Sequence, residues 1–412
     1  MDTQSDNYVI EAPVTRWKTA LGWGLYDIGT SGYFLVFPLY LFPVYLAERV
    51  FAGDPKFELY WGIAQGLAVF FAVTAGLALG KVLDLKGMQR VAPTIIVFAP
   101  VVCFLLPLLI AVHARPRILL GAYVVVHAIH LLSLTVYDAS LTRVAKPGAD
   151  RAVVSGWAWG WGYVGGLACM GLMEIGLFFY PRYSAWDFGV GVFYYLVASL
   201  LAAGWLRRTL TRQTVPDSTA VGGNERINRP TRTPWGLLLS MLLVVDGIAV
   251  FMSYTGLYGT KVVGLGERQM TMMLALLQLL AFPLTGIFAT LGSRNVPKAL
   301  LLCGGGWLAT VVLLVSASDM ARLLITIIVV SGVVGSTQAL LRALYADQIL
   351  AQHEIEGFGK YALIEKGAAF IGPVIAGILI PFVGYRIVLF ASGVAIMFGS
   401  VLIWKLTRKR DR

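Results

Sequence analysis

Gly-Lys-Val-Leu-Asp-Leu-Lys-Gly-Met-Gln-Arg, at residues 80–90, is a short polar segment between two long apolar stretches. The flanking stretches, 59–80 and 91–112, contain no Lys, Arg, Asp or Glu. Each is longer than the roughly 20 apolar residues that cross a bilayer as a helix. The segment therefore predicts a tight, charged turn that joins two membrane spans at one surface of the membrane.

Ten more stretches of this kind follow from the same count of uncharged residues. They are 28–47, 118–137, 152–173, 188–206, 247–260, 269–293, 299–318, 323–341, 367–385 and 387–404. The chain is 58% hydrophobic and 13% charged, against about 45–50% and about 25% in soluble proteins. This composition excludes a soluble enzyme and predicts an all-α integral membrane fold with twelve transmembrane helices.

The basic residues predict the orientation of these spans. When the N-terminus is placed in the cytoplasm, 22 of the 33 Lys and Arg residues fall on the cytoplasmic side and nine on the other. This asymmetry is typical of multi-pass proteins of the cell (inner) membrane, with both termini cytoplasmic. We therefore attribute the net charge of +11 to topology and to lipid headgroups near residues 405–412, and we expect no nucleic-acid partner.

The longest hydrophilic connection, residues 207–234, contains six Arg and divides the spans into six and six. It predicts an N-terminal six-helix bundle over 1–206, a basic cytoplasmic linker over 207–234 and a C-terminal six-helix bundle over 235–412. In transporters built from two such repeats, the substrate binds near the bilayer midplane between them.

The 80–90 segment has the pattern Gly-x-x-x-Asp-x-x-Gly-x-x-Arg, which resembles the loop signature of the major facilitator superfamily. The resemblance implies the two-bundle fold and a gating role for Gly80, Asp84, Gly87 and Arg90. In that family the glycines permit the turn, and the charged residues hold the outward-facing state. We accordingly expect Asp84 to cap or pair with a neighbouring helix end; the alternative is a solvated turn.

A narrower resemblance lies in the first span. Residues 23–33, Trp-Gly-Leu-Tyr-Asp-Ile-Gly-Thr-Ser-Gly-Tyr, are similar to the Trp-x-x-Tyr-Asp-Trp-Ala-Asn-Ser-x-Phe opening of the "unknown major facilitator" family, which includes vacuolar amino-acid effluxers of fungal autophagy. Segments 137–166 and 335–373 resemble two further blocks of that family. The resemblance implies efflux of an amino acid or a small peptide. Ile28, Thr30 and Tyr33 depart from the family pattern.

Two acids, Asp27 and Asp246, lie at similar depths in the first and seventh spans. A mid-span carboxylate costs about 2.5–3.5 kcal/mol on insertion scales, so it normally faces a cavity or a partner. Each is predicted to bind a coupling proton or a substrate ammonium group, or to form a permanent salt bridge or hydrogen bond. The neighbouring polar residues predicted to share these sites are Tyr26, Thr30, Ser31 and Tyr254.

His127 and His130 lie three residues apart in the fourth span and share a helix face. They either relay protons, bind a substrate carboxylate or form interhelical hydrogen bonds. Two histidines without a third ligand make a poor metal site. We therefore expect no metal or other cofactor.

A second charged group is predicted near the cytoplasmic ends of the spans. Arg342 either clamps a substrate carboxylate with its planar guanidinium or closes an inner gate with acids of the other bundle. Glu365 and Lys366, being adjacent on one helix, are expected to point in different directions and to need separate partners. Tyr137 and Asp138 complete the predicted gating set.

We interpret the chain as a secondary active transporter of a small polar solute, with proton coupling as the leading mechanism. One alternative is a sodium- or proton-coupled importer of a sugar, siderophore or other metabolite. An alternative of another class is a non-transporting membrane receptor. The sequence contains no Gly-x-x-x-x-Gly-Lys-Ser/Thr loop and no His-Glu-x-x-His motif, which argues against an enzyme. Analogy with the fold suggests a monomer.

Overall fold

The computed structural model describes residues 13–39, 41–52, 54, 56–176, 179–180, 183–212, 235–317, 320–349 and 352–408. In this part of the chain every regular element is a helix. Most of the predicted linker, residues 213–234, and the last four residues of the basic tail lie outside the described residues.

The helices of the first half form one group, which we call the N-terminal bundle. Its first span comprises α1 (Pro13–Phe34), the π-helical η1 (Leu35–Leu39), α2 (Leu41–Tyr45) and the π-helical η2 (Leu46–Val50). The later elements are α3 (Phe57–Lys86), α4 (Met88–Cys103), α5 (Leu105–Ala111), α6 (Pro116–Val144), α7 (Ala149–Gly176) and α8 (Ala185–Arg212).

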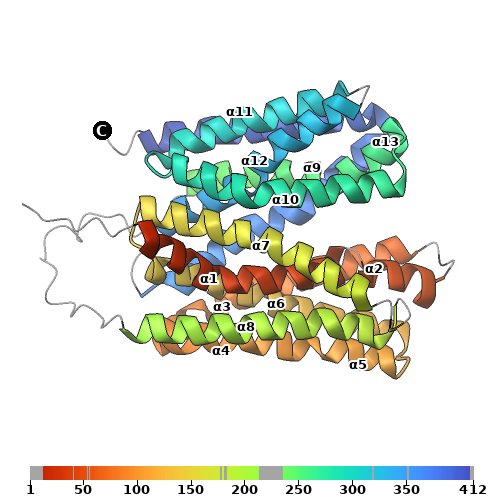
Figure 1. Cartoon of the computed structure of the whole chain (residues 1–412), viewed down its shortest axis with the longest axis horizontal. Helices are drawn as coiled ribbons and strands as arrows, with labels where there is room; N and C mark the ends of the chain where they lie inside the picture. The colour runs from red at the N-terminus through yellow and green to blue at the C-terminus, as the bar shows by residue number, and fades with distance from the viewer. Residues whose placement is uncertain are drawn as a thin grey trace, which may run out of the picture.

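The helices of the second half form the C-terminal bundle. They are α9 (Trp235–Tyr258), the π-helical η3 (Gly259–Val263), α10 (Glu267–Gly292), α11 (Val296–Val315), α12 (Met320–Ala346) and α13 (Glu354–Arg408). Figure 1 shows α9 to α12 above α1 to α8, with α7 and α10 at the boundary between the two groups.

Twelve spans result from these elements within the described residues. Ten segments are long and apolar enough to cross a membrane. One of them, α13, has 55 residues and is broken at Gly384, where φ is 79° and ψ is 163°, so it supplies two spans. The 28 residues of α7 add another of about 42 Å, at 1.5 Å per residue. The prediction of twelve transmembrane helices is confirmed, including the break between the last two.

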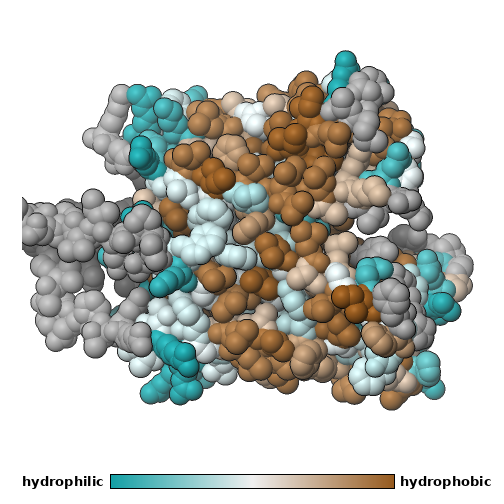
Figure 2. Space-filling model, viewed as in Figure 1, coloured by the Kyte–Doolittle hydropathy of each residue, from teal (hydrophilic) through white to brown (hydrophobic). Residues whose placement is uncertain are grey.

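The directions of the helices define the two ends of the molecule. α1, α7, α9 and α13 begin at one end, and α3, α6, α8 and α12 finish there; we call this end the terminal face and the other the opposite face. Figure 2 shows apolar residues over the middle of the molecule and hydrophilic residues gathered towards both ends. This banding is what a bilayer requires of a spanning protein.

Glycines on α7 bring both bundles against this helix. A Cβ atom at Gly160 would lie 2.7 Å from the Phe282 carbonyl oxygen of α10, and one at Gly162 would lie 3.0 Å from Ser31 Oγ of α1. Because helices in membranes associate through close backbone packing, these glycines explain why α7 lies between α1 and α10.

Candidate functional site

A cavity of about 430 Å³ lies between the two bundles, at mid-depth. Helices α1, α3 and α6 line it from one bundle, and α9, α12 and α13 from the other. Its walls include apolar side chains such as Phe34, Leu131 and Ile248. The polar residues that line it are Gln65, His127, Gln338, Glu365 and Lys366.

Glu365 and Lys366 form an ion pair with each other at this cavity, with 2.9 Å between Lys366 Nζ and Glu365 Oε2. The prediction that they point in different directions was wrong. Consecutive Cβ atoms on a helix do diverge, but these side chains have several rotatable bonds, and their charged ends turn towards each other. Both charges therefore lie at the cavity wall, about 15% exposed.

Gln65 lines the same cavity, and its amide nitrogen has no hydrogen-bond partner among the described residues. Its Oε1 accepts a hydrogen bond of 2.6 Å from the Tyr123 hydroxyl. An amide side chain has two further N–H donors, so a solute in the cavity has access to a fixed hydrogen-bond donor. No signal in the sequence distinguished Gln65 from other polar residues in the spans, whereas Gln338 lies in the segment 335–373 that resembles a family block.

The histidines of α6 lie in a buried aromatic network. Tyr33 Oη is 3.1 Å from His127 Nδ1, and Tyr195 Oη is 3.0 Å from His130 Nδ1. Tyr195 also contacts the Tyr26 hydroxyl at 2.7 Å. Of the two histidines, His127 lines the cavity. His130 is fully buried, and its Nε2 has no hydrogen-bond partner among the described residues.

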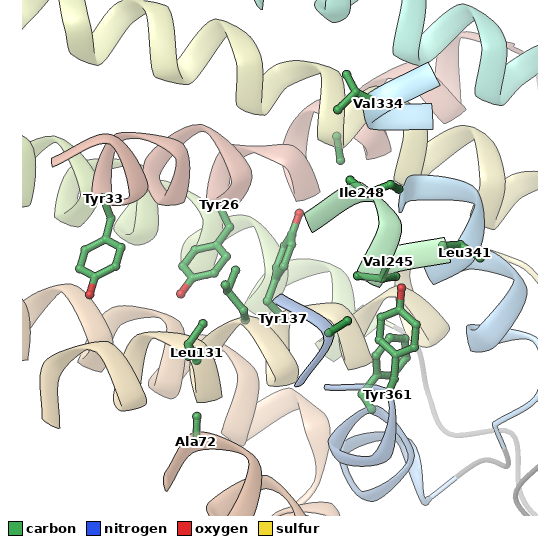
Figure 3. Close-up of a cluster of buried hydrophobic side chains, with 14 of the residues drawn as sticks. Tyr26, Tyr33, Ala72, Leu131, Tyr137, Val245, Ile248, Val334, Leu341 and Tyr361 are labelled. Carbon is green, nitrogen blue, oxygen red and sulfur yellow. The ribbon is translucent and has the colours of Figure 1, made fainter. Parts of the chain in front are cut away.

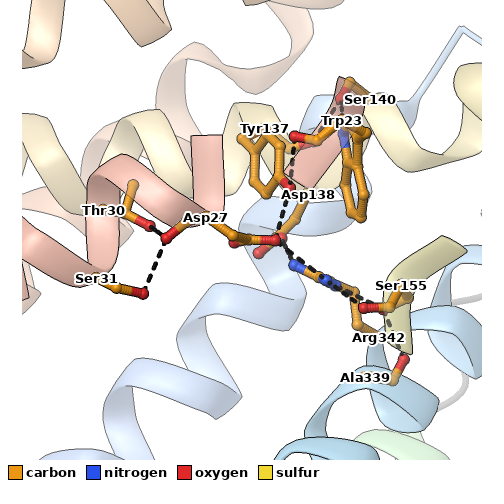
Figure 4. Close-up of polar contacts among 10 residues, drawn as sticks. All are labelled: Trp23, Asp27, Thr30, Ser31, Tyr137, Asp138, Ser140, Ser155, Ala339 and Arg342. Carbon is orange, nitrogen blue, oxygen red and sulfur yellow. Dashed lines mark hydrogen bonds and ion pairs between the residues drawn. The ribbon is translucent and has the colours of Figure 1, made fainter. Parts of the chain in front are cut away.

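Arg342 lies on the terminal-face side of the cavity and joins the two bundles. It projects from α12, 2% exposed, with Nη1 2.8 Å from Asp138 Oδ1 and Nη2 3.9 Å from Asp27 Oδ2. Its Nε donates to Ser155 Oγ at 3.0 Å. Figure 4 shows this guanidinium between the two carboxylates and Ser155. Of the two predicted arrangements, the structure therefore shows the pairing with acids of the other bundle.

Two indole rings of the N-terminal bundle cover the Arg342 guanidinium. Its central carbon is 4.6 Å from the Trp23 ring centroid and 5.1 Å from that of Trp159. Such contacts are strongest where water is excluded. The sequence did not indicate this role for Trp159, because the role depends on a residue 183 positions away.

Asp27 contacts Tyr137 as well as Arg342. The Tyr137 hydroxyl is 2.7 Å from Asp27 Oδ2 and 3.1 Å from the Trp23 carbonyl oxygen. Thr30 and Ser31 donate to the backbone carbonyl of Asp27, not to its carboxylate. Their predicted share in the binding site is therefore not seen in this conformation.

The aromatic residues around Asp27 belong to a buried cluster that continues into the C-terminal bundle. Figure 3 shows Tyr26 and Tyr137 near Leu131, and Val245 and Tyr361 on the other side of the group. These five side chains are at most 7% exposed. The Asp27 side chain is itself 11% exposed.

Asp246 and Tyr254 lie away from the cavity lining. The Asp246 carboxylate packs on Gly372 of α13, where a Cβ atom would lie 2.5 Å from Oδ1. The Tyr254 hydroxyl donates to the Pro373 carbonyl oxygen at 2.7 Å. In this conformation both residues join α9 to α13 within one bundle.

Two ion pairs connect the bundles nearer to the terminal face. Arg151 Nη1 is 2.8 Å from Asp347 Oδ1, and Arg143 Nη2 is 2.6 Å from Glu354 Oε1. Asp347 also accepts from the backbone N–H of Gly148. The pairing of Arg143 with Glu354 was not predicted, because a charged residue near a helix end is normally solvated.

The 80–90 segment forms the turn that was predicted. α3 ends at Lys86, Gly87 takes a φ of 82°, and α4 starts at Met88. The Asp84 carboxylate accepts from the backbone N–H groups of Ile355 and Glu356 at 2.9 and 3.0 Å. It thus caps the start of α13, in the opposite bundle, as an N-terminal acid does.

Gly80 permits the approach of α3 to α13, and Arg90 does not take part in it. A Cβ atom at Gly80 would lie 2.7 Å from Glu356 Cα. Arg90 is exposed and has no ion pair among the described residues. The predicted charge network around the turn therefore reduces here to Asp84 and the helix start that it caps.

Comparison with known proteins gives matches along nearly the whole chain. No protein-family model matches. An uncharacterised MFS-type transporter of Bacillus subtilis, YxiO, is 24% identical over 409 residues, which cover 92% of this chain and 94% of that protein.

Solved structures of transporters are also similar to this chain along nearly its whole length. The human organic anion transporter MFSD10 has a TM-score of 0.73 at 14% identity, with 95% of this chain and 100% of that chain covered. A bacterial homologue of the iron transporter ferroportin, in an outward-facing state, has a TM-score of 0.75 at 13% identity, with 96% and 99% covered. This chain is therefore a homologue of MFS-type transporters and has the fold of the major facilitator superfamily.

Proposed function

We propose that this chain is a secondary transporter that moves a small zwitterionic solute by alternating access, coupled to protons. The observation that carries the proposal is the cavity between the bundles, with an ion pair at its wall and a cross-bundle arginine cluster on one side. Family resemblance supports an amino acid or a small peptide as the solute and efflux as the direction.

The terminal face is, in this proposal, the cytoplasmic side. The positive-inside asymmetry of the sequence supports this orientation. Contacts through Arg342, Arg151, Arg143 and Asp84 join the bundles there. We therefore interpret the conformation as closed to the cytoplasm, and we assign these residues to the inner gate.

The Glu365–Lys366 pair is our choice for the solute contact. A zwitterion carries an ammonium and a carboxylate, so it can exchange with both partners of this pair and leave neither charge alone in the cavity. The free amide donor of Gln65 and the apolar walls would then hold the rest of the solute. A volume of about 430 Å³ lies in the range of about 300–1,000 Å³ that holds small ligands.

Asp27 is our choice for the coupling proton. The Tyr137 hydroxyl has one hydrogen but lies within hydrogen-bond distance of two oxygens, Asp27 Oδ2 and the Trp23 carbonyl. A carbonyl and an ionised carboxylate can only accept. Both contacts are satisfied together when Asp27 carries a proton and donates to Tyr137, while Tyr137 donates to Trp23.

Charge balance supports the same assignment. Arg342 supplies one positive charge to two buried carboxylates, Asp27 and Asp138. A proton on Asp27 makes the cluster neutral, and its loss leaves an excess buried negative charge, which is costly. Release of the proton would therefore favour opening of the inner gate to water.

Counterflow in proteoliposomes tests the proposal. Proteoliposomes that contain the purified chain are supplied with pools of labelled amino acids, dipeptides or sugars, while a dye trapped inside reports internal pH. We expect exchange of an amino acid or dipeptide with proton movement, loss of the proton movement in Asp27→Asn, and loss of exchange in Glu365→Gln. The control is Asp54→Asn, which changes an acid outside the cavity and the gate.

Other outcomes would overturn parts of the proposal. Sugar flux that follows sodium would support the importer instead. The absence of flux from every pool, in folded protein, would favour the receptor. Proton movement that persists in Asp27→Asn would remove Asp27 from the coupling role and leave Asp246, the other mid-span acid predicted for that role, as the candidate.

A further inference from the structure

A second cavity, about 640 Å³ in volume, lies on the outer surface of the C-terminal bundle at the terminal face. It is a groove between the start of α9 and the end of α13. The wall residues Leu239, Leu243 and Leu402 make it apolar. Lys405 and Arg408 lie at the end of the groove that is nearest the terminal face. None of these residues takes part in the transport cycle proposed above.

Small residues on α9 create the groove. Gly236 has no side chain, and a Cβ atom there would already lie 3.6 Å from Leu406 Cδ1 of α13. Ser240, one turn later, donates its hydroxyl to the Gly236 carbonyl at 2.7 Å. Because this hydroxyl is already hydrogen-bonded within α9, the groove offers an apolar surface to whatever occupies it.

The two cations at the end of the groove are exposed and carry no ion pair with any described residue. Among the residues that the structure describes, no acidic side chain lines the groove. The Arg408 guanidinium lies 5.3 Å from the ring centroid of Trp404, which also lines it. A tryptophan beside Lys and Arg is typical of the membrane–water interface, at the level of the lipid headgroups.

We propose that this groove binds an anionic phospholipid, with one acyl chain along the leucines and the phosphate between Lys405 and Arg408. Charge complementarity selects this occupant. A neutral detergent or zwitterionic lipid would cover the leucines but would bring no net negative charge to the two cations, whereas a basic interface attracts anionic headgroups.

Binding of phosphatidylglycerol to the purified chain in detergent, measured by native mass spectrometry, tests the site. Each Lys or Arg contributes about 1 kcal/mol to the attraction of anionic lipid, so Lys405→Gln/Arg408→Gln is expected to weaken binding about thirtyfold. The matched control is Arg207→Gln/Arg208→Gln, an equal charge change at exposed positions near the end of α8. It is expected to leave binding within about twofold of wild type, since these residues lie outside the groove.

A second measurement locates the acyl chain. Phosphatidylglycerol with brominated chains should quench Trp404 fluorescence, so the quenched fraction should fall in Trp404→Phe. Leu243→Trp, which fills the groove without changing charge, should reduce binding as well. Equal binding of phosphatidylcholine, equal loss in the Arg207/Arg208 control, or full competition by soluble glycerol phosphate would each overturn the proposal.

Discussion

Replacing Asp347 by Ala is expected to shift the protein towards a state open at the terminal face. The carboxylate accepts a hydrogen bond of 2.8 Å from Arg151 and two longer contacts from the Gly148 backbone N–H. Arg151 keeps its hydrogen bonds to the Thr142 and Ala145 carbonyls of its own bundle. The substitution therefore removes contacts across the interface and leaves the arginine in place.

The magnitude follows from the number and kind of contacts. A hydrogen bond to a charged group contributes about 1.5–3 kcal/mol. Because the Asp347 side chain is 23% exposed, we take about 2 kcal/mol, which raises the ratio of open to closed molecules about thirtyfold. Asp347→Asn keeps an acceptor for Gly148 but loses the charge, so we expect about 1 kcal/mol and about fivefold.

Double electron–electron resonance, which measures the distance between two spin labels, provides the assay. Labels at Arg208→Cys and Lys298→Cys report the terminal face, and labels at Arg117→Cys and Ser316→Cys report the opposite face. All four positions are exposed, whereas the three native cysteines are buried. The first pair should gain a longer-distance population in Asp347→Ala, and the second pair should change in the opposite sense.

Asp347→Ala distances that match those of wild type, in folded protein, would contradict this role of Asp347. Asn and Ala variants that open to the same extent would also contradict it, because the charge would then carry the whole effect and the Gly148 contact none. A double variant that also lacks Arg151 should open further than Asp347→Ala, since Arg151 Nη1 also donates to the Ala346 carbonyl across the interface at 2.9 Å.

Three further substitutions test the gate. Gly80→Ala should open the terminal face and slow flux, because its Cβ would lie 2.7 Å from Glu356 Cα. The control is Gly62→Ala, whose Cβ would have no atom within 4 Å, so the spin-label distances and flux should stay unchanged. Gly87→Ala should lower stability by about 1 kcal/mol, measured by thermal unfolding, because φ is 82°. Arg342→Lys should also open the gate, since an ammonium cannot reproduce the stacked, planar contacts; wild-type distances in this variant would contradict that role.

The fold could be predicted from the sequence because a bilayer imposes a simple requirement. Each crossing needs an uncharged run of about 20 residues, and such runs can be counted directly. The break at Gly384 lies at the end of the run 367–385, two residues before Arg386, the charge that separates it from the run 387–404. What the count could not provide is the internal irregularity of the first span, where η1 and η2 replace regular α-helix.

Only part of the candidate site could be predicted. Asp27, Asp138 and Arg342 stood out because charges in apolar spans are costly and need partners. Gln65 and Trp159 did not, because lipid and protein interior are both apolar, so hydrophobicity does not reveal which helix face is buried. Their positions depend on how six helices from two bundles meet, which local sequence does not encode.

The helices that carry the proposed solute contacts also carry the proposed inner gate. On α12, Gln338 lines the cavity and Arg342 lies one turn nearer the terminal face. On α13, Glu365 and Lys366 lie about 15 Å, at 1.5 Å per residue, from the helix start that Asp84 caps.

A solute that displaces the Glu365–Lys366 pair therefore acts on the same rigid helix that the gate must release, without a long chain of intervening residues. The difference in solute affinity between the open and closed states that this opening requires is bounded, since inverting a 1:99 population takes about 5.5 kcal/mol. The solute need not supply all of it. In the proposed mechanism, loss of the proton from Asp27 destabilises the closed cluster around Arg342, so proton release and solute binding would both favour the same opening.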